Sequence, residues 1–244
     1  MKEKNTISSR VSFWLSTILY PLFCYLLLPL YFGRIEVSGR ENIPKTDPLI
    51  LAPTHRSYWD GFILAYAAGR LTSGRDLHFM VTIDEYSKPI QGWFIKRLGG
   101  FPVDPKRPSI SSMRHSIELL LANKMQVIFP EGAPGAQGEV FRDNKIHPLK
   151  RGVASIALEA ESQKPGMEVK ILPISLKYSD PYPSWGTKVR VKIGSPLNVA
   201  KYSSDSLRKS SKKLTADLET ALKDIYEEKE SEDSVLFPST LKIN

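Results

Sequence analysis

A histidine and an aspartate with four residues between them are the side chains of this sequence best suited to act together in catalysis. His55 and Asp60 lie in the stretch THRSYWD at residues 54–60. A carboxylate that accepts a hydrogen bond from Nδ1–H of an imidazole fixes the ring tautomer and leaves Nε2 free to take a proton from a hydroxyl. The pattern is also consistent with an aspartate that caps a helix beside an unrelated loop histidine, because Asp60 occupies a helix N-cap position. Other segments must decide between the two interpretations.

A second candidate is the stretch FPEG at residues 129–132, which ends a predicted strand. Ligands of open α/β sheets bind at the edge where the strands end. We therefore expect Glu131 and the backbone N–H of Gly132 to lie beside the His55 loop. The alternative is a proline-glycine turn with an exposed glutamate.

Basic residues in two places are candidates for binding phosphate. Lys106 and Arg107 follow a predicted strand, and arginine is suited to bidentate phosphate contacts. Lys150 and Arg151 open a predicted helix, where positive charge opposes the helix dipole unless an anion is bound there. A solvated turn and an ordinary basic surface are the respective alternatives.

The elements that must position these side chains follow from the hydrophobic pattern. The apolar run LILA at residues 49–52 predicts a buried strand that ends at Pro53, and residues 61–68 predict a helix that ends at Gly69. Further strands are predicted around Ile35 and Val37 and at residues 79–83, 101–104, 125–129, 169–176 and 188–193, and further helices at 89–98, 111–123, 152–161 and 207–228. This alternation predicts an α/β fold with one mixed central sheet flanked by helices.

The segment from Val11 to Phe32 contains no charged residue. As a single helix it would be about 33 Å long, enough to cross a hydrocarbon core. Pro21 and Pro29 argue against one straight span, because proline removes a backbone hydrogen bond and kinks or breaks a helix. Aromatic rings along the whole segment are typical of an interfacial element. We therefore expect a monotopic membrane anchor, with two short helices bent at a proline; a buried core helix is the alternative.

Length and charge limit the remaining choices. A chain of 244 residues predicts one domain with appendages: residues 1–32 as the anchor, 33–228 as the folded domain and 229–244 as a charged, flexible tail. The net charge of +8 suits nucleic acid, an anionic membrane surface or phosphorylated substrates. We see no nucleic-acid-binding motif, and the uncharged segment at residues 11–32 would have no purpose in such a protein.

The single cysteine and the four histidines argue against several kinds of site. Cys24 excludes an internal disulfide and is compatible with a reducing compartment. Its apolar surroundings disfavour a thiolate, so a nucleophilic role is not expected. The histidines show no metal-ligand spacing. We therefore expect neither a metal nor another cofactor.

Four stretches in order resemble the blocks of the glycerolipid acyltransferases, and in particular the 1-acylglycerol-3-phosphate (lysophosphatidic acid) acyltransferases of bacteria and plastids. These stretches are His55-x4-Asp60, GFPVD at 100–104, FPEG at 129–132 and LPI at 172–174, and the resemblance covers residues 33–195. It implies an O-acyltransferase in which His55 and Asp60 are catalytic. It further implies that the second and third blocks contact the glycerol phosphate, and that the fourth, which contains Pro173, helps to shape the acyl pocket.

The sequence departs from the family pattern at two places. Pro105 occupies the position of an arginine that usually follows the second block, so Lys106 or Arg107 is expected to serve instead. The third block continues with APG at 133–135 in place of a threonine and an arginine, and Arg142 in the following loop is expected to supply that charge. Lys150 is a further candidate for neutralising the phosphate.

The expected reaction moves an acyl group from acyl-carrier protein or acyl-CoA to the free hydroxyl of a lysophospholipid. Nε2 of His55 removes the hydroxyl proton during attack on the thioester, and Asp60 stabilises the imidazolium that forms. A backbone N–H near Gly132 or Ser57 is expected to hold the oxyanion. Activity is expected to fall as the pH drops through the usual histidine range near ~6.5.

Two other functions remain open at this point. The same blocks would serve an acyltransferase that acts on glycerol-3-phosphate or on another lysolipid or lipid alcohol. A non-catalytic, basic protein that binds membrane surfaces is an alternative of another class. For the enzyme, we expect membrane association, with the active site facing the cytoplasm or a stroma-like compartment.

Overall fold

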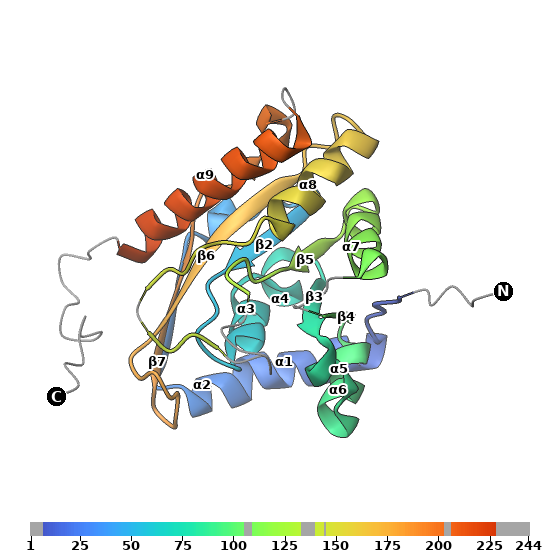
Figure 1. Cartoon of the computed structure of the whole chain (residues 1–244). Helices are drawn as coiled ribbons and strands as arrows, with labels where there is room; N and C mark the ends of the chain where they lie inside the picture. Colours follow the sequence, from blue (N-terminus) through green and yellow to red (C-terminus); the bar gives the residue numbers. More distant parts are fainter. Residues whose placement is uncertain (1–6, 105–108, 133–139, 144, 203–205, 228–244) are drawn as a thin grey trace.

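A mixed β-sheet forms the centre of the molecule. The computed structural model describes residues 7–104, 109–132, 140–143, 145–202 and 206–227 (Figure 1). In these residues eight strands form one sheet in the order β1-β7-β6-β2-β5-β3-β4, with β8 paired to β6. Strand β2 is parallel to β5 and β6, whereas β7 and β8 are antiparallel to β6. The strands are β1 (Arg34–Ser38), β2 (Leu49–Pro53), β3 (Leu77–Thr82), β4 (Gly100–Val103), β5 (Met125–Val127), β6 (Lys170–Tyr178), β7 (Lys188–Ile193) and β8 (Leu197–Asn198).

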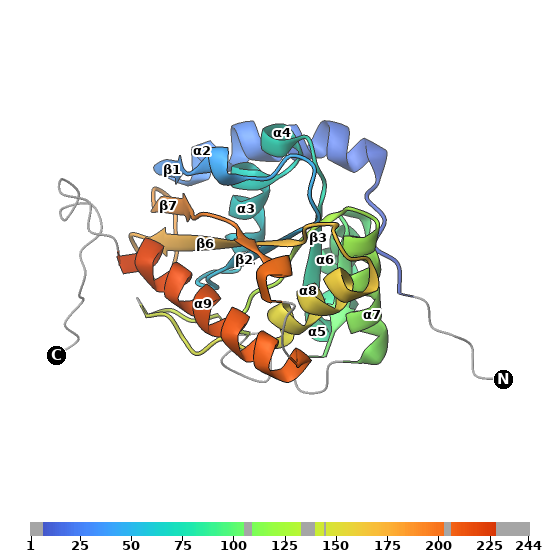
Figure 2. The same ribbon diagram turned by 90° about the horizontal axis from the view of Figure 1, so that it is seen from above.

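Helices cover both faces of this sheet, as Figures 1 and 2 show. The N-terminal helical segments and α3 lie on one face, and α7, α8 and α9 lie on the other. The predicted α/β architecture of a mixed sheet flanked by helices is confirmed. The helices are η1 (Leu15–Leu19), α1 (Tyr20–Leu22), η2 (Phe23–Leu27), α2 (Leu28–Tyr31), η3 (Arg40–Asn42), α3 (Asp60–Ala68), α4 (Arg70–Ser73), α5 (Ile83–Ser87), α6 (Pro89–Arg97), α7 (Ile110–Leu121), α8 (Gly152–Gln163), η4 (Val199–Tyr202) and α9 (Leu207–Glu227).

The strand that leads to His55 is buried on both sides. Successive side chains of a strand point to opposite faces. Leu49 and Leu51 of β2 pack into the core under α3 and the N-terminal segment, while Ile50 and Ala52 pack into the core under α8 and α9. All four side chains are completely buried. This packing gives the loop that carries His55 a rigid starting point.

The predicted helices and strands of the folded domain are present, with small shifts at their ends. The helix predicted at 61–68 is α3, and the amphipathic helix predicted at 207–228 is α9, which buries Leu214, Leu218 and Leu222. Ile83, predicted as the end of a strand, instead begins the short helix α5. The predicted tail at 229–244 lies outside the described residues.

The N-terminal segment differs from the two bent helices expected from its prolines. Helical residues follow one another without a break from Leu15 to Tyr31, with π-helical turns before each proline. In these wide turns the N–H of Tyr20 donates to Leu15 and that of Leu28 to Phe23. A proline ring clashes with the carbonyl four residues earlier in a regular α-helix. The wider turn before Pro21 and Pro29 makes room for the ring, so the helix continues.

One stripe of this segment is buried and the other side is exposed. Ser16, Cys24, Leu28 and Phe32 are buried against the domain. Large apolar side chains lie on the opposite side, at Phe13, Trp14, Ile18, Leu22, Tyr25, Leu26, Leu27 and Leu30. Across the part of the chain that the structure describes, we find no helix whose length and hydropathy would let it cross a membrane.

Candidate active site

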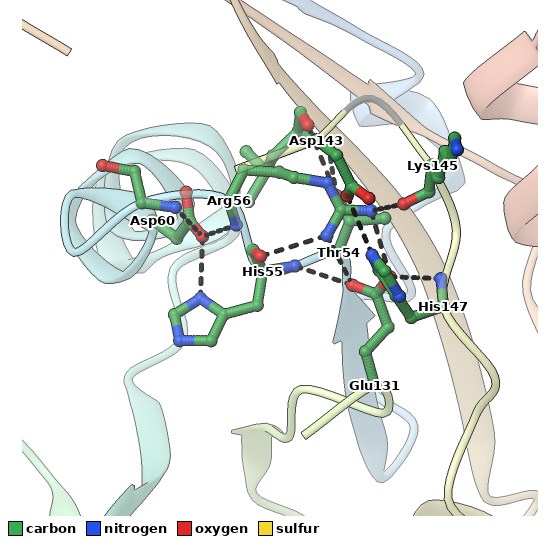
Figure 3. A network of polar contacts seen from close by, with 10 residues as sticks. Thr54, His55, Arg56, Asp60, Glu131, Asp143, Lys145 and His147 are labelled. Atoms are coloured by element: carbon green, nitrogen blue, oxygen red, sulfur yellow. Dashed lines mark hydrogen bonds and ion pairs between the residues drawn. The ribbon is translucent and has the colours of Figure 1, made fainter. Parts of the chain in front are cut away.

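The candidate site lies at the edge of the sheet where β2 and β5 end. The loop that carries His55 follows β2, and the turn that carries Glu131 follows the neighbouring parallel strand β5 (Figure 3). Thr54, the first residue of the His55 loop, is bound to β6: its N–H donates to Ile174 O, and its hydroxyl accepts from Leu176 N–H at 2.9 Å. The sequence prediction that these two loops share one edge is confirmed.

His55 and Asp60 contact each other directly. His55 Nδ1 lies 2.8 Å from Asp60 Oδ2, so an ionised carboxylate requires the proton on Nδ1 and leaves the lone pair on Nε2. In Figure 3, Nε2 points away from Asp60 and from the polar network. The His55 side chain is 19% exposed and that of Asp60 is completely buried. The interpretation of an unrelated loop histidine is therefore wrong.

The Asp60 carboxylate holds the loop rather than the end of the helix. Trp59 is the N-cap residue of α3 and Asp60 is its first residue, which corrects the expected N-cap position. Oδ2 also accepts from the backbone N–H groups of Arg56 at 2.7 Å and Ser57 at 2.9 Å. These bonds curl the chain around the carboxylate, which brings His55 within reach of it.

Two aromatic residues complete the surroundings of the pair. The Tyr178 hydroxyl donates to Asp60 Oδ1 at 2.7 Å. Burial, and then the charge of Asp60, raise the pKa of Tyr178 well above its usual value, so this phenol stays a donor. The ring of Phe129 stacks on the His55 ring, with centroids 4.0 Å apart. The strand alternation of β6, which places Tyr178 on the same face as Leu176, is the sequence signal that would have suggested Tyr178.

Glu131 lies at the centre of a buried polar network. Its carboxylate accepts from the His55 N–H, from both terminal nitrogens of Arg56, and from the His147 N–H. Arg56 also donates to Lys145 O. From the sequence, Glu131 is expected at the substrate, whereas Arg56 is not singled out by any motif. The contact of Glu131 with substrate stays a prediction.

The other residues named from the sequence occupy different positions. Lys106 and Arg107 lie outside the described residues. Lys150 is exposed beside the turn that carries Glu131, and its backbone N–H donates to Pro130 O. The Arg142 guanidinium lies over the Tyr182 ring, 4.5 Å from its centroid, and donates to Pro181 O.

Gly132 and Pro173 have clear structural surroundings. Gly132 has a φ of 71°, a left-handed conformation that favours glycine. Its N–H donates to Phe129 O, and that of Ser57 donates to Asp60, so neither of these two expected oxyanion donors points freely into the site. Pro173 is buried within the sheet, paired with Ala52 of β2.

Cys24 is buried in η2 of the N-terminal helical segment. Burial raises the pKa of its thiol to about 11. A thiol with this pKa is almost entirely protonated near neutral pH and is a poor nucleophile.

The comparison with known protein families decides the class of this protein. The acyltransferase family model matches residues 34–177, which include His55, Asp60 and Glu131. The chain belongs to the acyltransferase family. The resemblance read from the four blocks is thereby confirmed, and the protein is an acyltransferase enzyme.

Two curated relatives of this acyltransferase carry the same name. The 1-acyl-sn-glycerol-3-phosphate acyltransferase of Streptococcus pneumoniae is 27% identical over 204 residues, which cover 81% of this chain and 67% of that protein. The enzyme of that name from Bacillus subtilis is 30% identical over 125 residues, covering 51% of this chain and 57% of that protein.

The fold of this acyltransferase is also found in a solved structure. The crystal structure of the 1-acyl-sn-glycerophosphate (LPA) acyltransferase PlsC from Thermotoga maritima superposes with a TM-score of 0.64. The two chains are 24% identical, and the match covers 86% of this chain and 78% of that one. At this identity the likeness shows the shared fold.

Proposed function

We propose that this acyltransferase moves a fatty acyl group from an acyl-carrier-protein or acyl-CoA thioester to the free hydroxyl of 1-acylglycerol-3-phosphate, giving phosphatidic acid. The observation that carries the proposal is the 2.8 Å contact between His55 Nδ1 and Asp60 Oδ2, which leaves Nε2 available as a base. The acceptor is supported by the two curated relatives, each named as an acyltransferase of that lysolipid.

In the proposed reaction, His55 first acts as a base and then as an acid. Nε2 takes the proton of the acceptor hydroxyl while the oxygen attacks the thioester carbonyl. The C–S bond then breaks, and the leaving thiolate takes the proton from the imidazolium. Asp60 remains ionised throughout and stabilises the imidazolium, as in serine hydrolase triads. The acceptor alcohol is the nucleophile, so the reaction needs no acyl-enzyme, and we propose that it needs no metal or other cofactor.

Basic side chains near the site are proposed to bind the acceptor phosphate. Arg142 is held in place by its stacking on Tyr182 and its bond to Pro181 O, which leaves other guanidinium nitrogens for an anion. Lys150 lies beside the turn that follows Glu131. Lys106 and Arg107 are proposed to contribute from the segment after β4.

We also propose that the enzyme docks on a membrane through one apolar surface, the docking surface. It comprises the exposed side of residues 13–30, Ile90 and Trp93 of α6, and Tyr182 and Trp185 of the β6–β7 connection. In Figure 1 the N-terminal helical segment, α6 and this connection all lie along the lower side of the molecule. Trp and Tyr at such positions suit the interface between headgroups and acyl chains.

Close contacts join the docking surface to the catalytic loop. Phe23 packs on Phe62 of α3 with ring centroids 4.6 Å apart, and Tyr31 packs on Trp59 at 4.7 Å. Trp59 immediately precedes Asp60. These contacts place the docking surface next to the loop that carries His55. We propose that the docked face is cytoplasmic or faces a stroma-like compartment.

A substrate panel tests the proposed function. Purified protein in phospholipid vesicles is given 1-acylglycerol-3-phosphate, glycerol-3-phosphate or a monoacylglycerol, each with acyl-carrier-protein and acyl-CoA donors. The proposal predicts phosphatidic acid from the first acceptor with at least one donor. Turnover of glycerol-3-phosphate alone, or of the monoacylglycerol at an equal rate, would assign another acceptor.

A further inference from the structure

We propose that Arg56 and Glu131 form a positioning pair that holds the backbone of His55, and that Glu131 acts on the catalytic loop instead of on the substrate phosphate. In Figure 3 the pair lies beside the His55 backbone, with the imidazole ring on the other side. The kinetic test of this inference, through kcat and KM, rests on the proposed function. The hydrogen-exchange test needs no substrate and rests on the structure alone.

All hydrogen-bonding positions of the Glu131 carboxylate are occupied by protein groups. Oε2 accepts from His55 N–H at 3.0 Å and from Arg56 Nη1 at 2.8 Å. Oε1 accepts from Arg56 Nη2 at 3.0 Å and from His147 N–H at 2.8 Å. An ionised carboxylate offers about four lone-pair sites. The side chain is also completely buried, so it has neither a free position nor access for a glycerol hydroxyl.

Both terminal nitrogens of Arg56 are also bound by protein groups, whereas its buried Nε has no hydrogen-bond partner among the described residues. Its side chain is 5% exposed. Besides Glu131, it donates to His55 O at 3.0 Å and to Lys145 O at 2.6 Å. Burial acts to lower the pKa of Arg56, but the hydrogen bond and charge of Glu131 outweigh it and raise the pKa, so the guanidinium stays charged. The ring of Tyr226, in the last turn of α9, lies 5.4 Å from the guanidinium carbon.

The geometry of the pair explains what it does for catalysis. It holds both polar groups of the His55 backbone, the N–H through Glu131 and the carbonyl through Arg56. Asp60 and Phe129 hold the ring of the same residue. A displacement of a reacting group by about 1 Å costs on the order of 100-fold in rate. Loss of the pair should therefore lower kcat and leave the affinity for the acceptor largely unchanged.

Charge supports the same assignment. An unpaired glutamate beside a phosphate would repel it. In this structure the Glu131 charge is neutralised by a bidentate contact with Arg56, which is the strong form of this ion pair. The phosphate is then left to cations outside the pair, among which we propose Arg142.

The first experiment compares Glu131→Gln with Arg142→Gln and with a matched control, Glu161→Gln. Glu161 is also buried and also accepts two backbone N–H bonds, from Gly166 and Val169, but it lies at the far end of β6 from Tyr178. Glu131→Gln is expected to lower kcat at least about 10-fold with KM for 1-acylglycerol-3-phosphate changed less than about twofold. Arg142→Gln is expected to raise KM, and Glu161→Gln to leave kcat unchanged.

A double variant separates positioning from a loss of folding. Glu131→Gln leaves the Arg56 charge buried without its partner, which is the costly state of a buried ion pair. Arg56→Gln combined with Glu131→Gln removes both charges, and we expect it to regain part of the lost kcat. A raised KM with wild-type kcat in Glu131→Gln would overturn the proposal, because it would place Glu131 on the acceptor.

Hydrogen exchange tests the same pair with no substrate present. The His55 amide is protected by Glu131, so Glu131→Gln should speed its exchange, whereas Glu161→Gln should not. Unchanged exchange at His55 in a folded Glu131→Gln protein would also overturn the proposal. If the wild-type enzyme fails to acylate 1-acylglycerol-3-phosphate, the proposed function fails, and the exchange measurement still decides the role of the pair.

Discussion

The imidazole of His55 is held by groups from separate parts of the chain. Among the residues that bind its partner Asp60, Tyr178 is the most distant in sequence. Tyr178→Phe removes the hydroxyl that donates to Asp60 Oδ1 and leaves that buried oxygen without this bond. We expect the free energy of unfolding to fall by about 1–3 kcal/mol. Urea denaturation measures the change, and an unchanged midpoint would show that the contact contributes no stability.

At this scale the sequence predicted the contact between His55 and Asp60 better than the residues that hold the two in place. The spacing of His55 and Asp60 was enough to predict their contact, because a short loop brings the two together. Tyr178 is 118 residues from Asp60, and its contact depends on the register of β6 against β2, which a local pattern does not reveal. Glu131 was correctly expected beside the His55 loop, but the four bonds that fill its carboxylate depend on Arg56 and on the loop near His147.

At the scale of elements, Ser9 connects the N-terminal residues to β3 and to α7 through hydrogen bonds with two histidines. The Ser9 hydroxyl lies 3.1 Å from His78 Nδ1 and 2.8 Å from His115 Nε2. Burial lowers the pKa of both histidines, against the opposing charges of Asp76 near His78 and Glu118 near His115.

These lowered pKa values predict an acid-sensitive stability. The unfolded chain binds protons at histidine more tightly than the folded protein does, so the stabilisation is complete above the unfolded pKa near ~6.5. It is lost as the pH falls from there through the folded pKa values. We expect the urea midpoint to decrease between pH 7 and 5, and to decrease less in the His78→Gln, His115→Gln double variant. An equal decrease in both proteins would assign the acid sensitivity to other groups.

The pattern of elements was predictable wherever hydrophobic periodicity is strong. It identified β2, α3 and α9 with nearly correct ends. It failed for the N-terminal segment, because the effect of Pro21 and Pro29 was judged from a regular α-helix and not from the π-turns that accommodate them. It also failed at Ile83, where an apolar residue after a strand begins α5 instead of extending β3.

At the scale of the whole molecule, the mixed α/β fold followed from the alternation of strands and helices. The order of the strands did not, because β2 pairs with β5 and β6, which come much later in the chain. The docking surface was also only partly predictable from the sequence. Its N-terminal part was expected, whereas Trp185 and Ile90 are far from that part in sequence and are brought beside it by the fold.

This arrangement predicts that membrane binding depends on more than the N-terminal segment. The Ile90→Ser, Trp185→Ser double variant removes two large apolar side chains that are 77% and 73% exposed. We expect vesicle affinity to weaken about tenfold or more, since burying one such side chain contributes about 1.5–3 kcal/mol. Flotation of the protein with vesicles measures this affinity.

Ile110→Ser is the matched control for this experiment. Ile110 is also 77% exposed, but it lies on α7, away from the lower side of the molecule in Figure 1. Its substitution should leave flotation unchanged. Equal flotation of the double variant and the wild-type protein would mean that the β6–β7 connection and α6 do not enter the bilayer.

The most direct test of the account is the turnover of His55→Ala with 1-acylglycerol-3-phosphate and a thioester donor. Because Nε2 of His55 is the proposed base, we predict that kcat falls by a factor of about 10²–10⁴, while circular dichroism and vesicle flotation stay as in the wild-type protein. A correctly folded, membrane-bound His55→Ala protein that turns over at the wild-type rate would contradict the account.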